Sequence, residues 1–170
     1  MSNQKYTSAN TSINCNQLPT AFSKYTPYGY VMDYGCGKFI NMIKLHCNEN
    51  GAKYFPYDKY NQDEGTNKAT LLVAKRHGFD KVYCCNVLNV IDDESEIWNI
   101  LYNIFQYCNN HGTIIIQIYE GNKSGIGKAT KKDCYQRNEK TEEYTKYFGA
   151  FQGAPFTWER HSNIIVVTKH

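Results

Sequence analysis

The chain has 170 residues, a net charge of +3 and an aromatic content of 15%. This length suits one domain with a core of its own, and so small a positive charge does not by itself indicate a nucleic-acid partner. No apolar run is long enough to cross a bilayer, and the first residues lack an apolar signal core. We therefore expect no membrane association and a cytoplasmic location.

Seven cysteines are present and none belongs to a Cys-x-x-Cys pair, so the sequence predicts no metal site. We expect reduced thiols, as is usual in the cytosol. Cys84 and Cys85 are neighbours on an expected strand and should therefore point to opposite faces of the sheet.

The chain begins with a polar stretch. Residues 1–16 are rich in Ser, Thr and Asn and show no periodicity, which predicts a flexible arm ahead of a single domain over residues 17–170. A short helix is expected over residues 18–25.

The stretch from Gly29 to Phe39 organises the rest of the prediction. A short apolar strand ends at Asp33, a turn with Gly35 and Gly37 follows, and a helical pattern begins near Lys38. The first glycine allows a tight turn and the second lets a ligand approach the backbone closely. An α/β domain makes a cofactor cradle in this way at the carboxyl end of its first strand.

A second strand, expected over residues 52–57, is followed by Asp58. An acid at this distance after the glycine turn is where a Rossmann-type fold binds the ribose hydroxyls of a nucleotide. A dinucleotide site would also need a third glycine, and Ile40 stands at that position. The pattern therefore favours a nucleotide without a pyrophosphate over NAD.

The turn resembles the first motif of the class I methyltransferases, which use S-adenosylmethionine (SAM). That motif is an acid, any residue, Gly, any residue and Gly, and here it reads Asp33-Tyr34-Gly35-Cys36-Gly37. Phe39 stands where the family often has a further glycine. The resemblance implies SAM as the cofactor, held by the motif residues, with Asp58 at the ribose.

Residues 59–68 are expected to be a polar loop and residues 69–77 a helix. The family usually has a further strand and helix in this region, and the chain is too short for both, so the sheet should be trimmed at one edge. The resemblance also makes Tyr25 and Tyr28 candidate lid residues over the cofactor, although covering the edge of the core is the simpler role for both.

Residues 80–88 predict a buried strand near whose end Asn86 and Val87 lie. The equivalent family strand often ends in a polar residue beside the reacting centre, which implies a catalytic role for Asn86 and cofactor contacts for both residues. The alternative is a strand-end amide that satisfies loop backbone. No prolines follow Asn86 and no Pro-Cys occurs, which disfavours acceptors such as the exocyclic amines of bases and cytosine C5.

A helix is expected after Asp92 or Asp93, ending at residues 109–112, and a strand buried on both faces over residues 113–119. Tyr119 and Glu120 at the end of this strand are candidate catalytic residues. Residues 120–132 should form a mobile loop that contributes Lys131 and Lys132 to substrate binding, with an ordinary solvated loop as the alternative.

Residues 133–148 predict a helix, and residues 155–159 and 163–168 predict a terminal antiparallel hairpin with His161 as a further candidate for acceptor contact. The expected fold is a Rossmann-like three-layer α/β/α sandwich with a mostly parallel sheet and this hairpin at its end. The class I methyltransferase fold also ends in such a hairpin.

Two functions stay open at this stage. The first is transfer of a methyl group from SAM to an unidentified acceptor, which could be a small molecule, a nucleic acid or a protein, by in-line displacement. The second is a catalytically inactive Rossmann-like module that binds a nucleotide or a partner, which Phe39 favours. An oligomer or partner subunit could complete the trimmed edge.

Overall fold

The computed structural model describes residues 8–11, 16–149 and 155–170. The strands are β1 (Tyr30–Tyr34), β2 (Lys53–Tyr57), β3 (Phe79–Cys85), β4 (Cys108–Gln117), β5 (Lys128–Lys131), β6 (Cys134–Gln136), β7 (Phe156–His161) and β8 (Ile164–Lys169). The α-helices are α1 (Thr20–Lys24), α2 (Asn41–Glu49), α3 (Glu64–Arg76), α4 (Glu94–Tyr107) and α5 (Lys146–Gly149). Short 3-10 segments are η1 (Ala9–Thr11), η2 (Leu88–Val90) and η3 (Thr141–Thr145).

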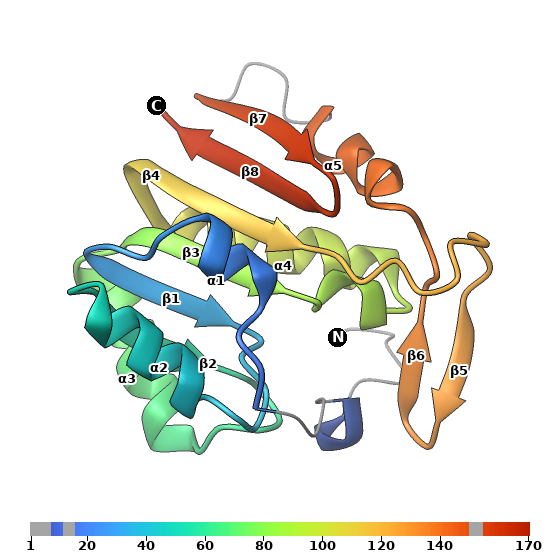
Figure 1. Ribbon diagram of the computed structural model, residues 1–170, viewed down its shortest axis with the longest axis horizontal. Helices are drawn as coiled ribbons and strands as arrows, with labels where there is room; N and C mark the ends of the chain where they lie inside the picture. The colour runs from blue at the N-terminus through green and yellow to red at the C-terminus, as the bar shows by residue number, and fades with distance from the viewer. Residues whose placement is uncertain (1–7, 12–15, 150–154) are drawn as a thin grey trace.

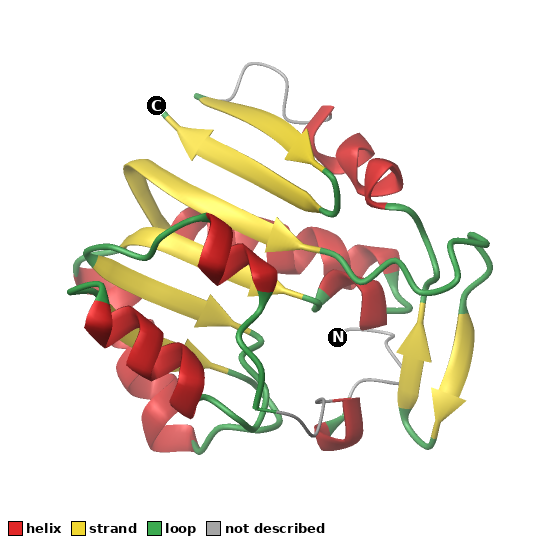
Figure 2. Cartoon of the chain, in the orientation of Figure 1, coloured by secondary structure: helices red, strands yellow, loops and turns green. Residues whose placement is uncertain are grey.

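The described residues form one large sheet and one separate hairpin (Figure 1). The large sheet has six strands in the order β2-β1-β3-β4-β8-β7, and the hairpin pairs β5 with β6. Strands β2, β1, β3 and β4 are mutually parallel, whereas β8 and β7 are antiparallel additions. Helices lie on both faces of the sheet (Figure 2), so the expected three-layer sandwich with a terminal hairpin is confirmed.

Alternate side chains along each strand enter two different cores. Val31, Tyr83 and Ile115 pack with buried residues of α1 and α2, whereas their strand neighbours pack on the other face, against α4 and α5. Because neighbours on a strand point to opposite faces, Cys84 lies in the α4 core and Cys85 packs against the other one, as expected.

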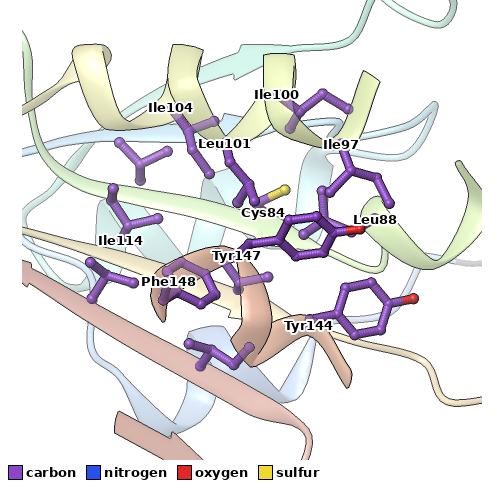
Figure 3. Close-up of a cluster of buried hydrophobic side chains, with 14 of the residues drawn as sticks. Cys84, Leu88, Ile97, Ile100, Leu101, Ile104, Ile114, Tyr144, Tyr147 and Phe148 are labelled. Carbon is purple, nitrogen blue, oxygen red and sulfur yellow. The ribbon is translucent and has the colours of Figure 1, made fainter. Parts of the chain in front are cut away.

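Helix α4 forms where its sequence predicts. The Asp93 side chain caps the first turn by accepting a hydrogen bond from the backbone of Ser95. One face of the helix is buried against β3, β4 and α5 (Figure 3), through Ile97, Ile100, Leu101 and Ile104. Burial of side chains of this size stabilises the fold by roughly 2 kcal/mol each.

The trimmed edge is also present. Only α3 lies between β2 and β3 in the sequence, so β2 is the edge strand. Pro56 stands in this strand, where a missing N–H is tolerated at an edge. The Thr70 hydroxyl, from α3, donates a hydrogen bond of 2.7 Å to the Pro56 carbonyl and so ties the helix to the strand.

Several helix and strand boundaries differ from the prediction. Helix α2 begins at Asn41 instead of near Lys38, because the turn continues past Gly37, whose φ is 72°. Helix α3 begins at Glu64, inside the expected loop, because Asp63 caps it by accepting a bond from Thr66. Strand β4 begins at Cys108, so residues 109–112 belong to the strand instead of ending the preceding helix.

The segment between β4 and β7 was predicted wrongly. Residues 133–148 do not form one helix but contain β6, η3 and α5, and β5 occupies part of the loop expected over residues 120–132. Asp133 and Asn138 both have a φ of 57°, a left-handed conformation that interrupts a helix. Tyr144, Tyr147 and Phe148 nevertheless pack in the α4 core (Figure 3).

Candidate cofactor site

A cavity of about 300 Å³ lies at the carboxyl ends of the parallel strands, where ligands bind in open α/β sheets. Its volume is at the lower end of the range for small-molecule sites. Its walls come from the turn after β1, the loops after β2 and β3, the end of β4 and the segment that leads into α1. The cavity therefore crosses four strand ends in the order β2, β1, β3 and β4.

The glycine turn forms one wall. The backbone N–H groups of Gly35 and Cys36 donate to the Tyr57 carbonyl at 2.7 and 3.2 Å, which fixes the turn against the end of β2. Gly35 has a φ of 74°, and a Cβ at this position would lie 2.4 Å from Cγ2 of Val87. The turn therefore needs glycine here for its conformation and for its packing.

Asp58 is 9% exposed and holds the loop after β2. Its Oδ1 accepts hydrogen bonds from the backbone N–H groups of Tyr60 and Asn61, both at 2.9 Å, and from Asn61 Nδ2 at 3.1 Å. Its Oδ2 accepts the N–H of Gly37 at 2.9 Å, which joins the two predicted cofactor motifs directly. A carboxylate oxygen has two lone pairs, so Oδ2 keeps the capacity for one more donor.

Asp33 lies beneath the turn and does not line the cavity. It is 2% exposed, and its carboxylate accepts a hydrogen bond of 2.7 Å from the Tyr54 hydroxyl. Burial raises the pKa of Asp33 to about 7, against the lowering effect of that hydrogen bond.

Tyr34 is also outside the cavity wall, and its ring packs on the ring of Tyr57 with the two ring centres 5.0 Å apart. Cys36 does line the cavity, and burial raises the pKa of its thiol, so it is a neutral group there.

Asn86 and Val87 line the cavity together with Gln117. Asn86 adopts a φ of 59°, which asparagine tolerates better than most residues, and its N–H donates to the Gln117 carbonyl at 2.8 Å. Both polar atoms of the Gln117 side-chain amide have hydrogen-bond partners. Its Oε1 accepts the N–H of Ala21 at 2.8 Å, and its Nε2 lies 3.4 Å from Oδ1 of Asn86.

Gln117 is a lining residue that was not predicted from the sequence. Its signal was a polar residue at the end of an otherwise apolar strand, 7% exposed in the structure. Other lining residues that were not predicted include Ser8, Gln17, Pro19, Thr20, Ile43, Cys85, Val90 and Ile91, whereas Tyr60 and Asn61 belong to the loop expected beside the cofactor. Phe39 lines the cavity but is 44% exposed, so it lies at the rim and does not fill the floor.

Four other predicted site residues do not line the cavity. Tyr119 is 61% exposed. Glu120 accepts the N–H of Thr141 at 2.7 Å and forms an ion pair with Lys123, and the hydrogen bond from Thr141 lowers the Glu120 pKa. Lys131 and Lys132 are exposed on the β5–β6 hairpin. His161, a further candidate, ends β7 and contacts Glu159 at 3.1 Å.

The segment before β1 covers the cavity, but not through the two candidate tyrosines. Residues 17–20 and Ser8 line it. Tyr25 instead accepts a hydrogen bond from the Tyr83 hydroxyl through its carbonyl, and Tyr28 lies beneath the Lys81 ammonium at 4.9 Å. Most of the predicted arm, residues 1–7 and 12–15, falls outside the described residues.

The described part of the chain contains no group of three His, Cys, Asp or Glu side chains placed to hold a metal ion. Its helices include none that combines the length and apolar character needed to cross a membrane.

Neither a protein-family model nor a characterised protein sequence matches the chain. Several solved structures match its fold. The 1,6-didemethyltoxoflavin-N1-methyltransferase of Burkholderia thailandensis, solved with 1,6-didemethyltoxoflavin and S-adenosylhomocysteine, matches at a TM-score of 0.62 and 16% identity, over 88% of this chain and 75% of that chain. A methyltransferase from Pyrococcus furiosus matches at 0.52 and 11%, over 88% and 80%.

The glycopeptide N-methyltransferase MtfA, complexed with sinefungin, matches at a TM-score of 0.55 and 8% identity, over 92% of this chain and 94% of that chain. At identities this low, the structural similarity shows the fold alone. The chain has the Rossmann-like fold of the class I SAM-dependent methyltransferases, as its glycine motif predicted.

Proposed function

We propose that the protein is a SAM-dependent methyltransferase. The observation that carries the proposal is the hydrogen bond between the Gly37 N–H and Asp58 Oδ2, because it brings the glycine turn and the ribose acid together in one cavity. The fold supports it, since the three neighbours described above are all methyltransferases.

The residues present fit a nucleoside cofactor. Asp58 Oδ2 can accept a hydrogen bond from a ribose hydroxyl, and Gly35 and Gly37 line the cavity without a Cβ, so a ligand can approach the backbone of the turn closely. Adjacent strands are roughly 4.8 Å apart, so the cavity extends over roughly 14 Å from β2 to β4, which suits an elongated nucleoside. SAM, when bound, supplies an activated methyl group. The chain must hold the acceptor in line with it and exclude water.

The second candidate is a module that binds a nucleotide or a partner without turnover. It is favoured by the position of Tyr119 and Glu120, because these two of the three candidate catalytic residues lie outside the cavity wall, which Asn86 alone of the three lines. Turnover separates the two candidates, because the second can share nucleotide binding with the first but not catalysis. A cytoplasmic location belongs to this proposal as well, and the free state of all cysteines in the described residues is consistent with it.

The first test is calorimetric titration with S-adenosylhomocysteine. We expect the wild type to bind it and not to bind NAD. Asp58→Asn keeps one oxygen for the loop but removes the charge, and should weaken binding at least about tenfold, or ~1.4 kcal/mol. Glu64→Gln is the matched control, because Glu64 is an exposed carboxylate paired with Lys68 on α3. A folded wild type that does not bind S-adenosylhomocysteine would disprove the proposal.

A further inference from the structure

The two ends of the cavity differ in chemistry. The end at β2 has the carboxylate of Asp58, whereas the end at β3 and β4 is built from Cys85, Asn86 and Gln117, with the segment before α1 above them. With a nucleoside at the β2 end, the methyl acceptor must approach from the β3–β4 end. The side chains at the β3–β4 end therefore determine which methyl acceptor binds.

Asn86 and Gln117 form an amide pair whose orientation is fixed. Gln117 Oε1 is used by the Ala21 N–H, so the cavity side of this residue offers its Nε2 protons. Nε2 in turn faces Asn86 Oδ1, which leaves Asn86 Nδ2 as a donor with no acceptor in the described part of the chain. The pair therefore presents N–H donors, and these recognise a compound that offers lone pairs.

This end also lacks a general base. Among the described residues that line the cavity, Asp58 is the only Asp, Glu or His, and it lies at the opposite end. The stretches outside the described residues, 1–7, 12–15 and 150–154, contain none of these residue types. The Cys85 thiol is neutral, because burial raises its pKa. An alcohol would need a base to take its proton, and an alkylammonium would need one before it could react.

We infer that the methyl acceptor of the proposed reaction is a neutral heterocycle with at least two ring nitrogens, recognised through the lone pair of one nitrogen by Asn86 and Gln117 and methylated on another. The inference rests on the proposed function and specifies its substrate class. A ring nitrogen with low basicity carries a free lone pair near pH 7, so it needs no base in the site.

The reaction balances without a further reactant. The lone pair of the ring nitrogen forms the new N–CH₃ bond, and the electron pair of the broken S–CH₃ bond stays on sulfur. The positive charge passes to the heterocycle, which afterwards loses a proton to water where the ring carries one.

The test measures binding of three probes of similar size to protein saturated with S-adenosylhomocysteine, by ligand-detected NMR and calorimetry. Quinazoline is neutral and has two ring nitrogens with free lone pairs, so one can accept from the amide pair while the other attacks the methyl group; benzylamine is a cation and benzoate is an anion. We expect quinazoline to bind at least about tenfold more tightly than the other two. Mass spectrometry after incubation with SAM should then place the methyl group on one of its ring nitrogens.

Asn86→Asp tests the assigned residue. Aspartate also tolerates a φ of 59° and can still accept from Gln117 Nε2, so the fold should be retained. The new carboxylate should tighten benzylamine binding and weaken quinazoline binding, each at least about tenfold. Asn110→Asp makes the same change at an exposed residue at the far end of β4 and should leave the order of the three probes unchanged.

The inference is overturned if benzylamine or benzoate binds the wild type as tightly as quinazoline, if quinazoline does not bind the saturated protein, or if the two aspartate variants behave alike. Saturation with S-adenosylhomocysteine is measured first. Failure at that step disproves the proposed function and the acceptor class with it, whereas failure with the probes disproves the acceptor class alone.

Discussion

Two regions of the molecule are held together in different ways. Residues 30–117 form the parallel part of the sheet, where apolar side chains alternate between two cores. Residues 119–149 form the β5–β6 hairpin and the turns after it, where polar side chains bind backbone groups that are distant in sequence. The first region is stabilised by the packing of apolar side chains that recur at regular spacing along each strand. The second is stabilised by individual hydrogen bonds between residues far apart in sequence.

The hairpin is attached beside the cavity through such bonds. Gln136 accepts from Asn89 Nδ2 at 3.2 Å and donates to the Tyr119 carbonyl at 3.0 Å, and the Arg137 N–H donates to the Asn89 carbonyl at 2.9 Å. Asn89 belongs to η2, directly after the cavity-lining Asn86 and Val87. A region held in this way should open locally without unfolding the sheet.

The largest expected effect is in the parallel region, at Asp33. Its pKa in the fold is about 7 against an ordinary 3.8, so the folded state binds this proton more tightly than the unfolded state. The associated stability is complete at low pH and is lost as pH rises through 7. Relative to Asp33→Asn, the wild type should lose roughly 4 kcal/mol between pH 4 and pH 8. Urea denaturation of both proteins across this range measures it, and parallel pH profiles would contradict it.

The next effect tests the packing of the same region. Gly35→Ala adds a methyl group 2.4 Å from Val87 and forces a side chain into a left-handed conformation, so it should cost about 3 kcal/mol and also weaken S-adenosylhomocysteine binding. Gly51→Ala is the matched control, since Gly51 has a similar φ of 72° and open space around it. Equal losses of unfolding free energy in the two variants would show that the contact with Val87 does not matter.

The smallest effect is in the hairpin region. Asn138 Nδ2 donates to the Ile126 carbonyl at 2.9 Å, and its Oδ1 accepts the Asn122 N–H at 3.3 Å. Asn138→Ala removes both bonds and should cost about 2 kcal/mol, confined to this region.

Hydrogen exchange by mass spectrometry should therefore show faster exchange over residues 119–139 and unchanged exchange in β1 and β3. Asn122→Ala, at an exposed residue whose side chain accepts a single bond from Ser124, is the control with a smaller effect. Faster exchange in β1 or β3 would mean that the two regions unfold together.

The same contrast explains what the sequence could predict. The strands of the parallel region were predicted because their apolar patterns are local, and Asp58, Gly37, Asn86 and Val87 were placed at one cavity because the carboxyl ends of parallel strands share one edge. For these four residues, the amino-acid type and the position at a strand end were enough to predict that they line one cavity.

The remaining site residues depend on contacts that no local pattern contains. Gln117 is held at the cavity by hydrogen bonds to Ala21 and Asn86, which are far from it in sequence. Tyr119 and Glu120 were expected at the site because the strand was extended to residue 119, but β4 ends at Gln117 and the chain then leads away to the hairpin. The helix predicted over residues 133–148 failed for the same reason, since polar bonds at Gln136 and Asn138 fix another conformation.

The trimmed edge of the sheet has a consequence for aggregation. An open edge strand offers N–H and carbonyl groups to any other extended chain. In β2 the Lys53 N–H and the Tyr57 carbonyl bond toward β1, so the groups of Pro56 face outward. Pro56 has no N–H to offer, and its carbonyl is already bonded to Thr70. Strand addition is therefore blocked at Pro56, toward the carboxyl end of β2, and the shortened sheet is protected against polymerising edge to edge there.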